Sequence, residues 1–188
     1  MTRIHLYATL VMSVLAWGFH AQADDAETTT ITAQGLTLQI PKTWKAHQPS
    51  SSMRLAQFVI PAAGGDLEPA ELVVFPPFGG SISENAKRWV GQFQAENRTV
   101  DMKQGKATQG DYVLVDLSGT FNKPDGPMMM QKTKPAPNYR VINVMITPAS
   151  GGNYTLKLTG PNKTVSAAVE AFRKSFGADA SKETAYEF

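Results

Sequence analysis

Alternation of hydrophobic and polar residues predicts strands in the first part of the chain. Over residues 36–40 every second residue is Leu or Ile, which is typical of a half-buried strand, and Pro41 ends the pattern. Residues 31–33 can pair with this strand in a hairpin. Segments 54–60 and 70–75 have the apolar content of two more strands. The chain therefore opens with three strands, the first of them in a hairpin.

A helix is predicted over residues 81–95. Ser81 and Glu84 have the spacing of a capping box, in which each side chain bonds the other residue's backbone. Gly91 inside this segment costs about 1 kcal/mol relative to Ala unless a neighbour packs closely there. The apolar face of the helix consists of Ile82, Ala86, Trp89, Val90 and Phe93.

Strand patterns return after this helix. Segments 100–108 and 112–121 are predicted as strands, and 139–147 and 154–159 form a hairpin around a Ser-Gly-Gly-Asn turn. Residues 122–138 are rich in Pro and Lys and are predicted to be a loop, which in a compact domain is usually a binding loop or a mobile one.

A last helix follows Pro161 and stops at Gly177. Its apolar stripe consists of Val165, Ala168, Val169, Phe172 and Phe176. The fold class is therefore α+β, a mainly antiparallel sheet of about six or seven strands packed by two amphipathic helices. One domain is expected over residues 36–177, with a lead-in at 24–35 and a flexible tail at 178–188.

The N-terminus has the parts of a signal peptide. Arg3 and His5 precede an apolar run over residues 6–17, and Ala21-Gln22-Ala23 forms a cleavage site before Asp24. The run is shorter than the roughly 20 residues that span a bilayer. We therefore expect residues 1–23 to be removed, and the mature protein to be periplasmic or secreted without a membrane anchor.

Composition excludes several classes of function. The 188 residues carry a net charge of +2 with scattered basic residues, so a nucleic-acid partner is not expected. The sequence has no Cys, which excludes thiol nucleophiles and disulfides. His47 is the only histidine after the signal peptide, so a histidine zinc site is excluded by count. We predict no cofactor and no metal, and an exposed position for His47.

Three groups of residues are candidates for chemistry. Asn85, Arg88 and Gln92 share one edge of the first helix, where Arg54 and Gln57 from a strand can face them; an ordinary polar flank is the alternative. Asp66, Glu68 and Glu71 can converge on a cation or sugar, or belong to a solvated loop. Met128, Met129 and Met130 can offer soft ligands to Cu(I), or form an apolar loop that contacts a partner. Aromatic side chains that can line a cleft are Trp44, Trp89, Tyr139 and Tyr154, although Trp89 lies on the apolar face.

Four strings together resemble a family of short, exported, uncharacterised bacterial proteins. They are Met53-Arg54-Leu55-Ala56-Gln57-Phe58, Ala70-Glu71-Leu72-Val73-Val74-Phe75, Arg88-Trp89-Val90-Gly91-Gln92-Phe93 and Lys157-Leu158-Thr159-Gly160-Pro161. The resemblance covers most of residues 36–176 and carries no catalytic residue. More distantly, the element order is similar to the PsbP-like fold, which implies binding of protein partners rather than catalysis.

The sequence thus predicts an exported non-catalytic binding or accessory module, with an unknown protein or small molecule as its partner. Its predicted binding residues are Arg54, Gln57, Asn85, Arg88, Gln92 and Met128 to Met130. The alternative is a periplasmic hydrolase or small-ligand enzyme that uses Glu71 or Asp66 as a base.

Overall fold

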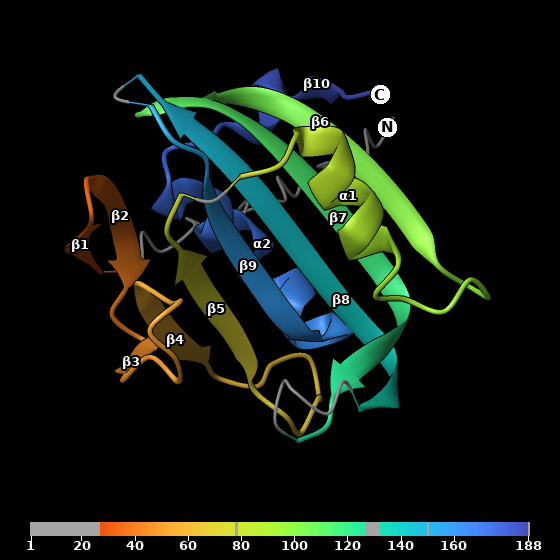
Figure 1. Ribbon diagram of the computed structural model, residues 1–188. Coiled ribbons are helices and arrows are strands. Elements are labelled where there is room, and N and C mark those ends of the chain that lie inside the picture. The colour runs from red at the N-terminus through yellow and green to blue at the C-terminus, as the bar shows by residue number, and fades with distance from the viewer. Residues whose placement is uncertain (1–26, 78, 127–131, 150, 188) are drawn as a thin grey trace, which may run out of the picture.

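The computed structural model describes residues 27–77, 79–126, 132–149 and 151–187. Figure 1 shows a twisted sheet with α1 in front of it and α2 behind it. The helices are α1 (Ile82–Val90) and α2 (Asn162–Ser175). The strands are β1 (Thr28–Ala33), β2 (Leu36–Pro41), β3 (Lys45–His47), β4 (Ala56–Ile60), β5 (Ala70–Phe75), β6 (Thr99–Ala107), β7 (Gly110–Pro124), β8 (Thr133–Pro148), β9 (Tyr154–Pro161) and β10 (Thr184–Ala185).

Eight of these strands form one sheet in the order β10-β6-β7-β8-β9-β5-β4-β3, and every neighbouring pair in it is antiparallel. β1 and β2 form a separate hairpin. The predicted α+β fold with a mainly antiparallel sheet is confirmed. The main sheet has more strands than predicted, because β3 and β10 are only three and two residues long and have no alternation to reveal them.

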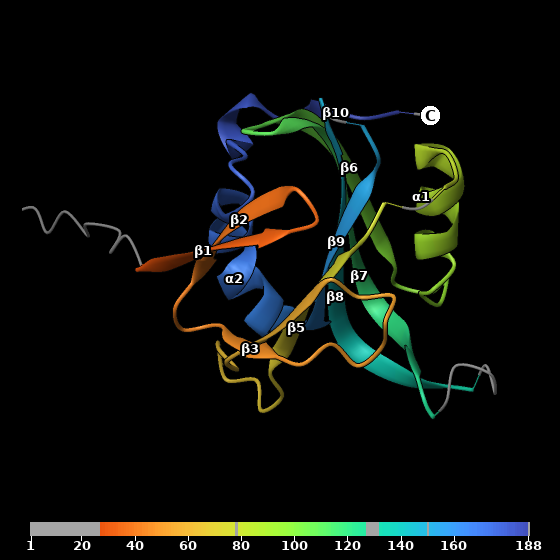
Figure 2. The same cartoon turned by 60° about the vertical axis from the view of Figure 1, so that its left-hand side comes forward.

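One face of the sheet packs against α2 and the β1–β2 hairpin, which lie side by side in Figure 2. Strand residues of one parity point to this face, among them Leu114, Val144 and Leu156, all fully buried. Phe172 of α2 and Leu38 of the hairpin close this layer. The second helix begins after Pro161 and ends before Gly177, whose φ of 76° is a conformation that glycine adopts readily.

The opposite face packs against α1 over β7 and β8. Trp89 and Ala86 of the helix are buried against Val115 and Val141 of the sheet. In Figure 1, α1 lies over this side of the sheet, while β9, β5 and β4 run beside it without a helix over them.

The first helix is shorter than predicted. It ends at Val90 with Gly91 as its C-cap, whereas the apolar pattern predicted a helix to residue 95. Phe93 instead forms an antiparallel bridge with Phe121, and the Asn122 N–H donates to Gln92 O. Phe93 is still buried on the α1 face, as its spacing predicted, because the bridge replaces the last helical turn.

The predicted loop at 122–138 is wrong for its described residues. β7 continues to Pro124 and β8 begins at Thr133, so Asn122 pairs with Pro135 and Lys123 with Lys134. β6 pairs with this ribbon only as far as Ser118 and β9 only as far as Tyr139, and beyond those points the described residues add only the bridge from Phe93 to Phe121. Pro residues are tolerated there because no further neighbour needs their missing N–H. Met128, Met129 and Met130 lie outside the described residues.

The two terminal segments differ from the prediction as well. β1 begins at Thr28, inside the expected lead-in 24–35. The expected flexible tail holds β10, which pairs with β6, and Glu183, which accepts hydrogen bonds from Arg173 at 2.7 and 2.9 Å. A buried ion pair and a strand partner are contacts that no local pattern reveals. The predicted signal peptide lies outside the described residues, and within the described ranges no helix is long and apolar enough to cross a membrane.

Candidate functional site

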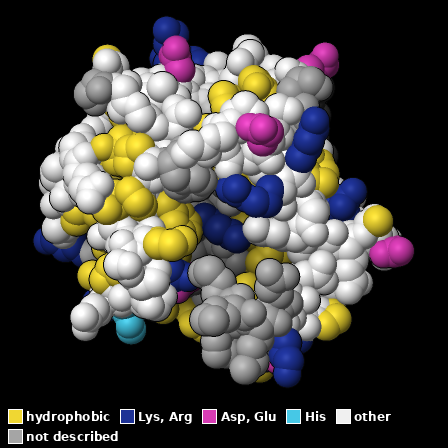
Figure 3. All heavy atoms as spheres, viewed as in Figure 1, with side chains coloured by type: hydrophobic (Ala, Val, Ile, Leu, Met, Phe, Trp, Pro, Cys, Tyr) yellow, Lys and Arg dark blue, Asp and Glu magenta, His cyan; other side chains and the backbone are white. Residues whose placement is uncertain are grey.

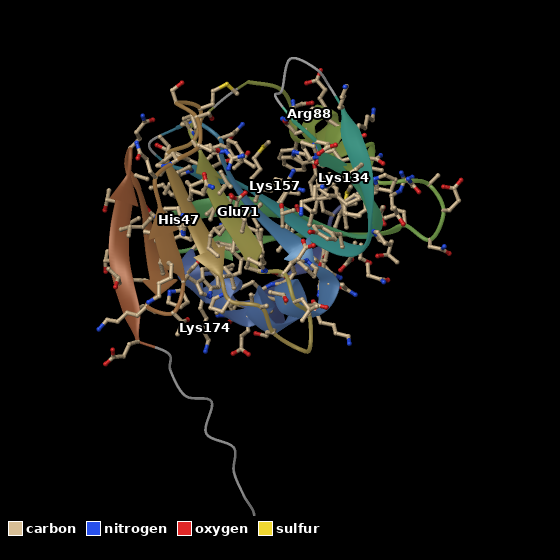
Figure 4. All side chains as sticks on the ribbon, turned by 90° about the horizontal axis from the view of Figure 1, so that it is seen from below. His47, Glu71, Arg88, Lys134, Lys157 and Lys174 are labelled. Carbon is tan, nitrogen blue, oxygen red and sulfur yellow. The ribbon has the colours of Figure 1, made fainter. Side chains whose placement is uncertain are left out.

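A group of charged and polar side chains lies on the α1 face of the sheet, beside the helix. We call it the polar hollow and define it by Arg54, Gln57, Glu71, Arg88 and Lys157. Figure 3 shows Lys and Arg side chains gathered in and around a hollow near the middle of this face. In Figure 4, Glu71 and Lys157 lie near one another on β5 and β9, and Arg88 lies on the α1 side of them.

Strand register brings the β-strand members of the polar hollow together. β4 pairs with β5 and β5 pairs with β9, so Gln57 lies opposite Val73, which in turn lies opposite Lys157. Neighbours of these residues in sequence, such as Phe58, Leu72 and Leu158, belong to the α2-side core. Because side chains alternate between the two faces of a sheet, Gln57, Glu71 and Lys157 all point to the α1 face.

Glu71 is held by two donors. Gln57 Nε2 donates to Glu71 Oε1 at 2.6 Å, and Arg54 Nη1 lies 3.4 Å from Glu71 Oε2. Arg54 Nη1 also donates to Gln57 Oε1 at 3.0 Å. The three side chains thus form a closed network, in which the negative charge of Glu71 is already partnered.

Lys157 reaches into the hollow from β9 and is largely buried. Its ammonium donates to Gln92 Oε1 at 2.9 Å and lies 5.4 Å from the centre of the Phe121 ring. The pKa of Lys157 is lowered to about 8, mainly by burial and in addition by the positive charges of Arg54 and Arg88, against the opposing effect of Glu71. Within the described part of the chain the ammonium has no carboxylate in ion-pair contact.

The capping box of α1 fixes where the helix side chains lie. The Glu84 N–H donates to Ser81 Oγ at 3.1 Å, and Glu84 Oε2 accepts from the Ser81 N–H at 2.7 Å. One turn on, buried Asn85 donates to Ser81 O at 2.9 Å and accepts from Arg88 Nη2 at 2.5 Å. The carbonyl oxygen of Asn85 therefore orients the Arg88 guanidinium at the rim of the hollow.

Five of the predicted binding residues lie in or beside the polar hollow, and their binding role stays a prediction. Arg54 and Gln57 come from one side of the hollow, and Arg88 and Gln92 come from the helix side. Asn85 takes a supporting position under Arg88.

Sequence reasoning missed Lys157 and two buried polar residues of the sheet. Asn143 lies opposite Lys157 in the β8–β9 register, and Thr155 lies two residues before it. Both are at most 2% exposed, and among the described residues neither the Asn143 amide nor the Thr155 hydroxyl has a hydrogen-bond partner. The sequence signal that could have revealed these residues is a polar residue inside an otherwise apolar strand, as in Leu156-Lys157-Leu158.

Of the two alternatives for Asp66, Glu68 and Glu71, convergence on a cation or sugar is not seen, because the three side chains lie in different places. Asp66 accepts from the Thr164 N–H at 2.8 Å at the start of α2. Glu68 accepts from the Tyr139 hydroxyl at 2.7 Å, and this bond together with Lys123 lowers the pKa of Glu68. Glu71 is in the polar hollow. Among the described residues no group of three His, Asp or Glu side chains could hold a metal ion.

The four aromatic side chains do not share a cleft, and Trp89 packs in the core as its place on the apolar face predicted. Trp44 and Tyr154 are buried in the α2-side core, whereas Trp89 and Tyr139 are buried in the α1-side core. The sheet therefore separates the two pairs. His47 is exposed on β3, as predicted.

A second cavity, of about 560 Å³, lies at the other end of α1. It is bordered by Ile82, Val113, Met145, Lys182 and Tyr186. Lys106 and Asp111 in its wall pair with each other at 3.4 Å, and both are well exposed. This cavity has no buried charge, so the polar hollow is the stronger candidate site.

Comparison with solved structures finds the cyanobacterial PsbP protein (CyanoP) of Synechocystis sp. PCC 6803. Its TM-score is 0.46 and its sequence identity 10%, over 88% of this chain and 96% of CyanoP. No protein-family model and no curated protein matches the chain. The resemblance to short exported bacterial proteins stays a prediction, and the polar hollow is interpreted from its own residues alone.

Proposed function

We propose that this chain is an exported, non-catalytic binding module whose ligand site is the polar hollow. The observation that carries the proposal is Lys157, a largely buried cation whose partners among the described residues are an amide oxygen and an aromatic ring. Burial of a charge without a charged partner is unfavourable, so such a group usually serves a site.

The alternative, a carboxylate-based enzyme, finds less support in the geometry. Its two candidate bases lie on opposite sides of the sheet, Asp66 at the start of α2 and Glu71 on the α1 face. Glu71 is held by Gln57 and Arg54, which favours an electrostatic role for its charge over proton transfer.

Export is supported by the N-terminal pattern of a basic start, a short apolar run and Ala21-Gln22-Ala23. We expect the full chain, expressed in a Gram-negative host, to appear in the periplasmic fraction with Asp24 as its first residue. Intact-mass measurement reads this directly. A full-length product retained in the cytoplasm would contradict export.

The binding role is tested by purifying the protein from the periplasm and measuring which small molecule stays bound to it. We expect native mass spectrometry to detect a retained small molecule on the wild-type protein and much less of it on Arg88→Ala. The control is Lys174→Ala, which removes the same charge from an exposed position on α2, on the opposite face. It should retain the molecule as the wild type does.

Stability separates a binding role of Arg88 from a structural one. Arg88→Ala should lower the free energy of unfolding by only about 1–2 kcal/mol, because Arg88 is exposed and the loss is limited to its hydrogen bond to buried Asn85. The adjacent Trp89→Ala should lower the free energy of unfolding by about 3–5 kcal/mol, because Trp89 is 4% exposed in the core. Retention that is equal in all folded variants, or a collapse of stability in Arg88→Ala, would reject the proposed site.

A further inference from the structure

We infer that Lys157, Arg54 and Arg88 bind the oxyanion group of a small ligand, a carboxylate or a phosphate. This inference names the ligand class for the binding module proposed above and rests on that proposal.

The first support is the balance of charge in the polar hollow. Three cations reach it from separate elements: Arg54 before β4, Arg88 on α1 and Lys157 on β9. Against them stands Glu71, whose carboxylate is already bonded to Gln57 and Arg54. Positive charge is therefore in excess in this hollow, and a bound anion would offset it.

The second support is the incomplete coordination of Lys157. An ammonium group has three N–H donors, and here one bonds Gln92 Oε1 at 2.9 Å while the Phe121 ring centre lies 5.4 Å away. Neither partner is charged. Hydrogen bonds from a cation to an anionic oxygen are roughly twice as strong as those between neutral groups. An oxyanion is therefore the partner that this ammonium lacks.

The third support is independent of charge. Asn143 and Thr155 lie next to Lys157 in the sheet and face the same side, and their side-chain polar atoms are buried without partners among the described residues. Buried polar groups in proteins almost always have partners. The Asn143 amide N–H and the Thr155 hydroxyl are therefore buried donors beside Lys157 whose hydrogen bonds are not yet made.

The same features exclude other ligand classes. A metal cation would meet three positive side chains and a single carboxylate, which already has partners. A nucleic-acid backbone needs a stripe of cations, whereas these three face one hollow. Arg88 is exposed and Arg54 partly so, which leaves the hollow open to a small ligand from solvent.

Isothermal titration of the mature chain beginning at Asp24 tests the inference, with inorganic phosphate and succinate as separate probes and glucose as the neutral control. We expect saturable binding of phosphate or succinate and none of glucose. Which anion binds more tightly tells whether the site prefers a phosphate or a carboxylate.

Variants then locate the binding. Lys157→Met and Arg88→Ala should each weaken binding of the preferred anion about tenfold or more, because each removes a charged donor. Thr155→Val removes a hydroxyl at nearly constant shape and should weaken binding several-fold, so the buried donors beside Lys157 are tested even if Lys157→Met folds poorly. Lys174→Ala on the opposite face should bind as the wild type does.

Two results would overturn the inference: no saturable binding of either anion, or binding that Lys157→Met, Arg88→Ala and Thr155→Val leave unchanged. Its failure can be told apart from failure of the proposed function. If the molecule retained from the periplasm depends on Arg88 but is neutral or cationic, the binding module stands and the oxyanion site is wrong. If nothing is retained and neither anion binds, both are wrong.

Discussion

Lys157 is a charged residue that its neighbours in the sequence hold in a buried position, although a charged side chain is more stable in water. Leu156 and Leu158 on either side of it are fully buried in the α2-side core, and they hold β9 in the middle of the sheet. Alternation along the strand then turns Lys157 to the α1 face, where Gln92 is the partner of its ammonium. The apolar contacts of its neighbours thus offset the unfavourable burial of its charge.

The depressed pKa of Lys157 makes stability depend on pH in a defined direction. Its pKa is about 8 in the folded protein and about 10.4 in an unfolded chain. Between these values the unfolded chain binds more protons, so the free energy of unfolding rises with pH across this window and the contribution is lost as pH falls through 8. Lys157→Met lacks this contribution.

We therefore expect the stability of the wild type, relative to Lys157→Met, to increase by about 1–3 kcal/mol from pH 7 to pH 10. Urea denaturation at both pH values measures this difference. Lys174→Met, at an exposed position, is the matched control and should show little change in the same comparison. If the stability difference between the wild type and Lys157→Met is the same at both pH values, the charge of Lys157 is not buried.

At the scale of elements, α1 is a short helix that depends on its ends and its apolar face. It has nine residues, and isolated helices of that length are marginal in water. The capping box at Ser81 satisfies backbone donors at its start, and Trp89 and Ala86 anchor it to the sheet. α1 carries Arg88 and ends just before Gln92. The capping box, by fixing where the helix begins, therefore also fixes where these two residues lie beside the polar hollow.

Ser81→Ala should lower the free energy of unfolding by about 1 kcal/mol, because it removes the hydroxyl that accepts from the Glu84 N–H. Urea denaturation measures the change. Ser52→Ala, at an exposed serine in a loop, is the control and should fall within about 0.5 kcal/mol of the wild type. Equal stability of the two variants would show that the Ser81 cap does not stabilise the folded protein.

For the molecule as a whole, residues after α2 fasten one edge of the sheet. β10 pairs with β6, and Glu183 bonds both Arg173 of α2 and the hydroxyl of Tyr112 in β7. Burial and the bond to Glu183 raise the pKa of Tyr112. We call Glu183 and β10, with these contacts, the terminal clamp, because they connect α2 to β7 and to the edge strand β6.

A chain that ends at Gly177 should lose about 3 kcal/mol or more of unfolding free energy, because Arg173 is left buried without its counter-ion. Faster hydrogen exchange of the β6 amides should accompany the loss. Glu183→Ala in the full chain should reproduce most of this destabilisation. Lys182→Ala, at an exposed position, is the control and should change the free energy of unfolding by at most about 1 kcal/mol. An unaltered denaturation midpoint in the shortened chain would contradict the clamp.

Local periodicity was sufficient to predict most of the elements. The strands at 36–41, 70–75 and 154–161, the start of α1 at Ser81 and the start of α2 after Pro161 appear close to where the pattern placed them. Each is specified by residues within one or two turns or by strand alternation. Asn85 and Arg88 lie on α1 at the predicted spacing for the same reason, whereas Gln92, predicted on the same helix edge, lies beyond the end of the helix.

Pairing between distant segments was not predictable by the same reasoning. Residues 133–138 form a strand because β7 offers them a partner, and β10 exists because the edge of β6 is open to it. Phe93 leaves the helix because Phe121 offers it a bridge. In each case the deciding contacts join different segments of the chain, and the pattern within either segment alone does not reveal them.

The sequence by itself determined the class of fold, both amphipathic helices and the absence of thiol chemistry, since these follow from composition and from hydrophobic spacing along the chain. Only the tertiary structure decided that Arg54, Arg88 and Lys157 meet beside buried Asn143 and Thr155. Strand order and register set which side chains become neighbours, and both depend on contacts between residues up to about a hundred positions apart.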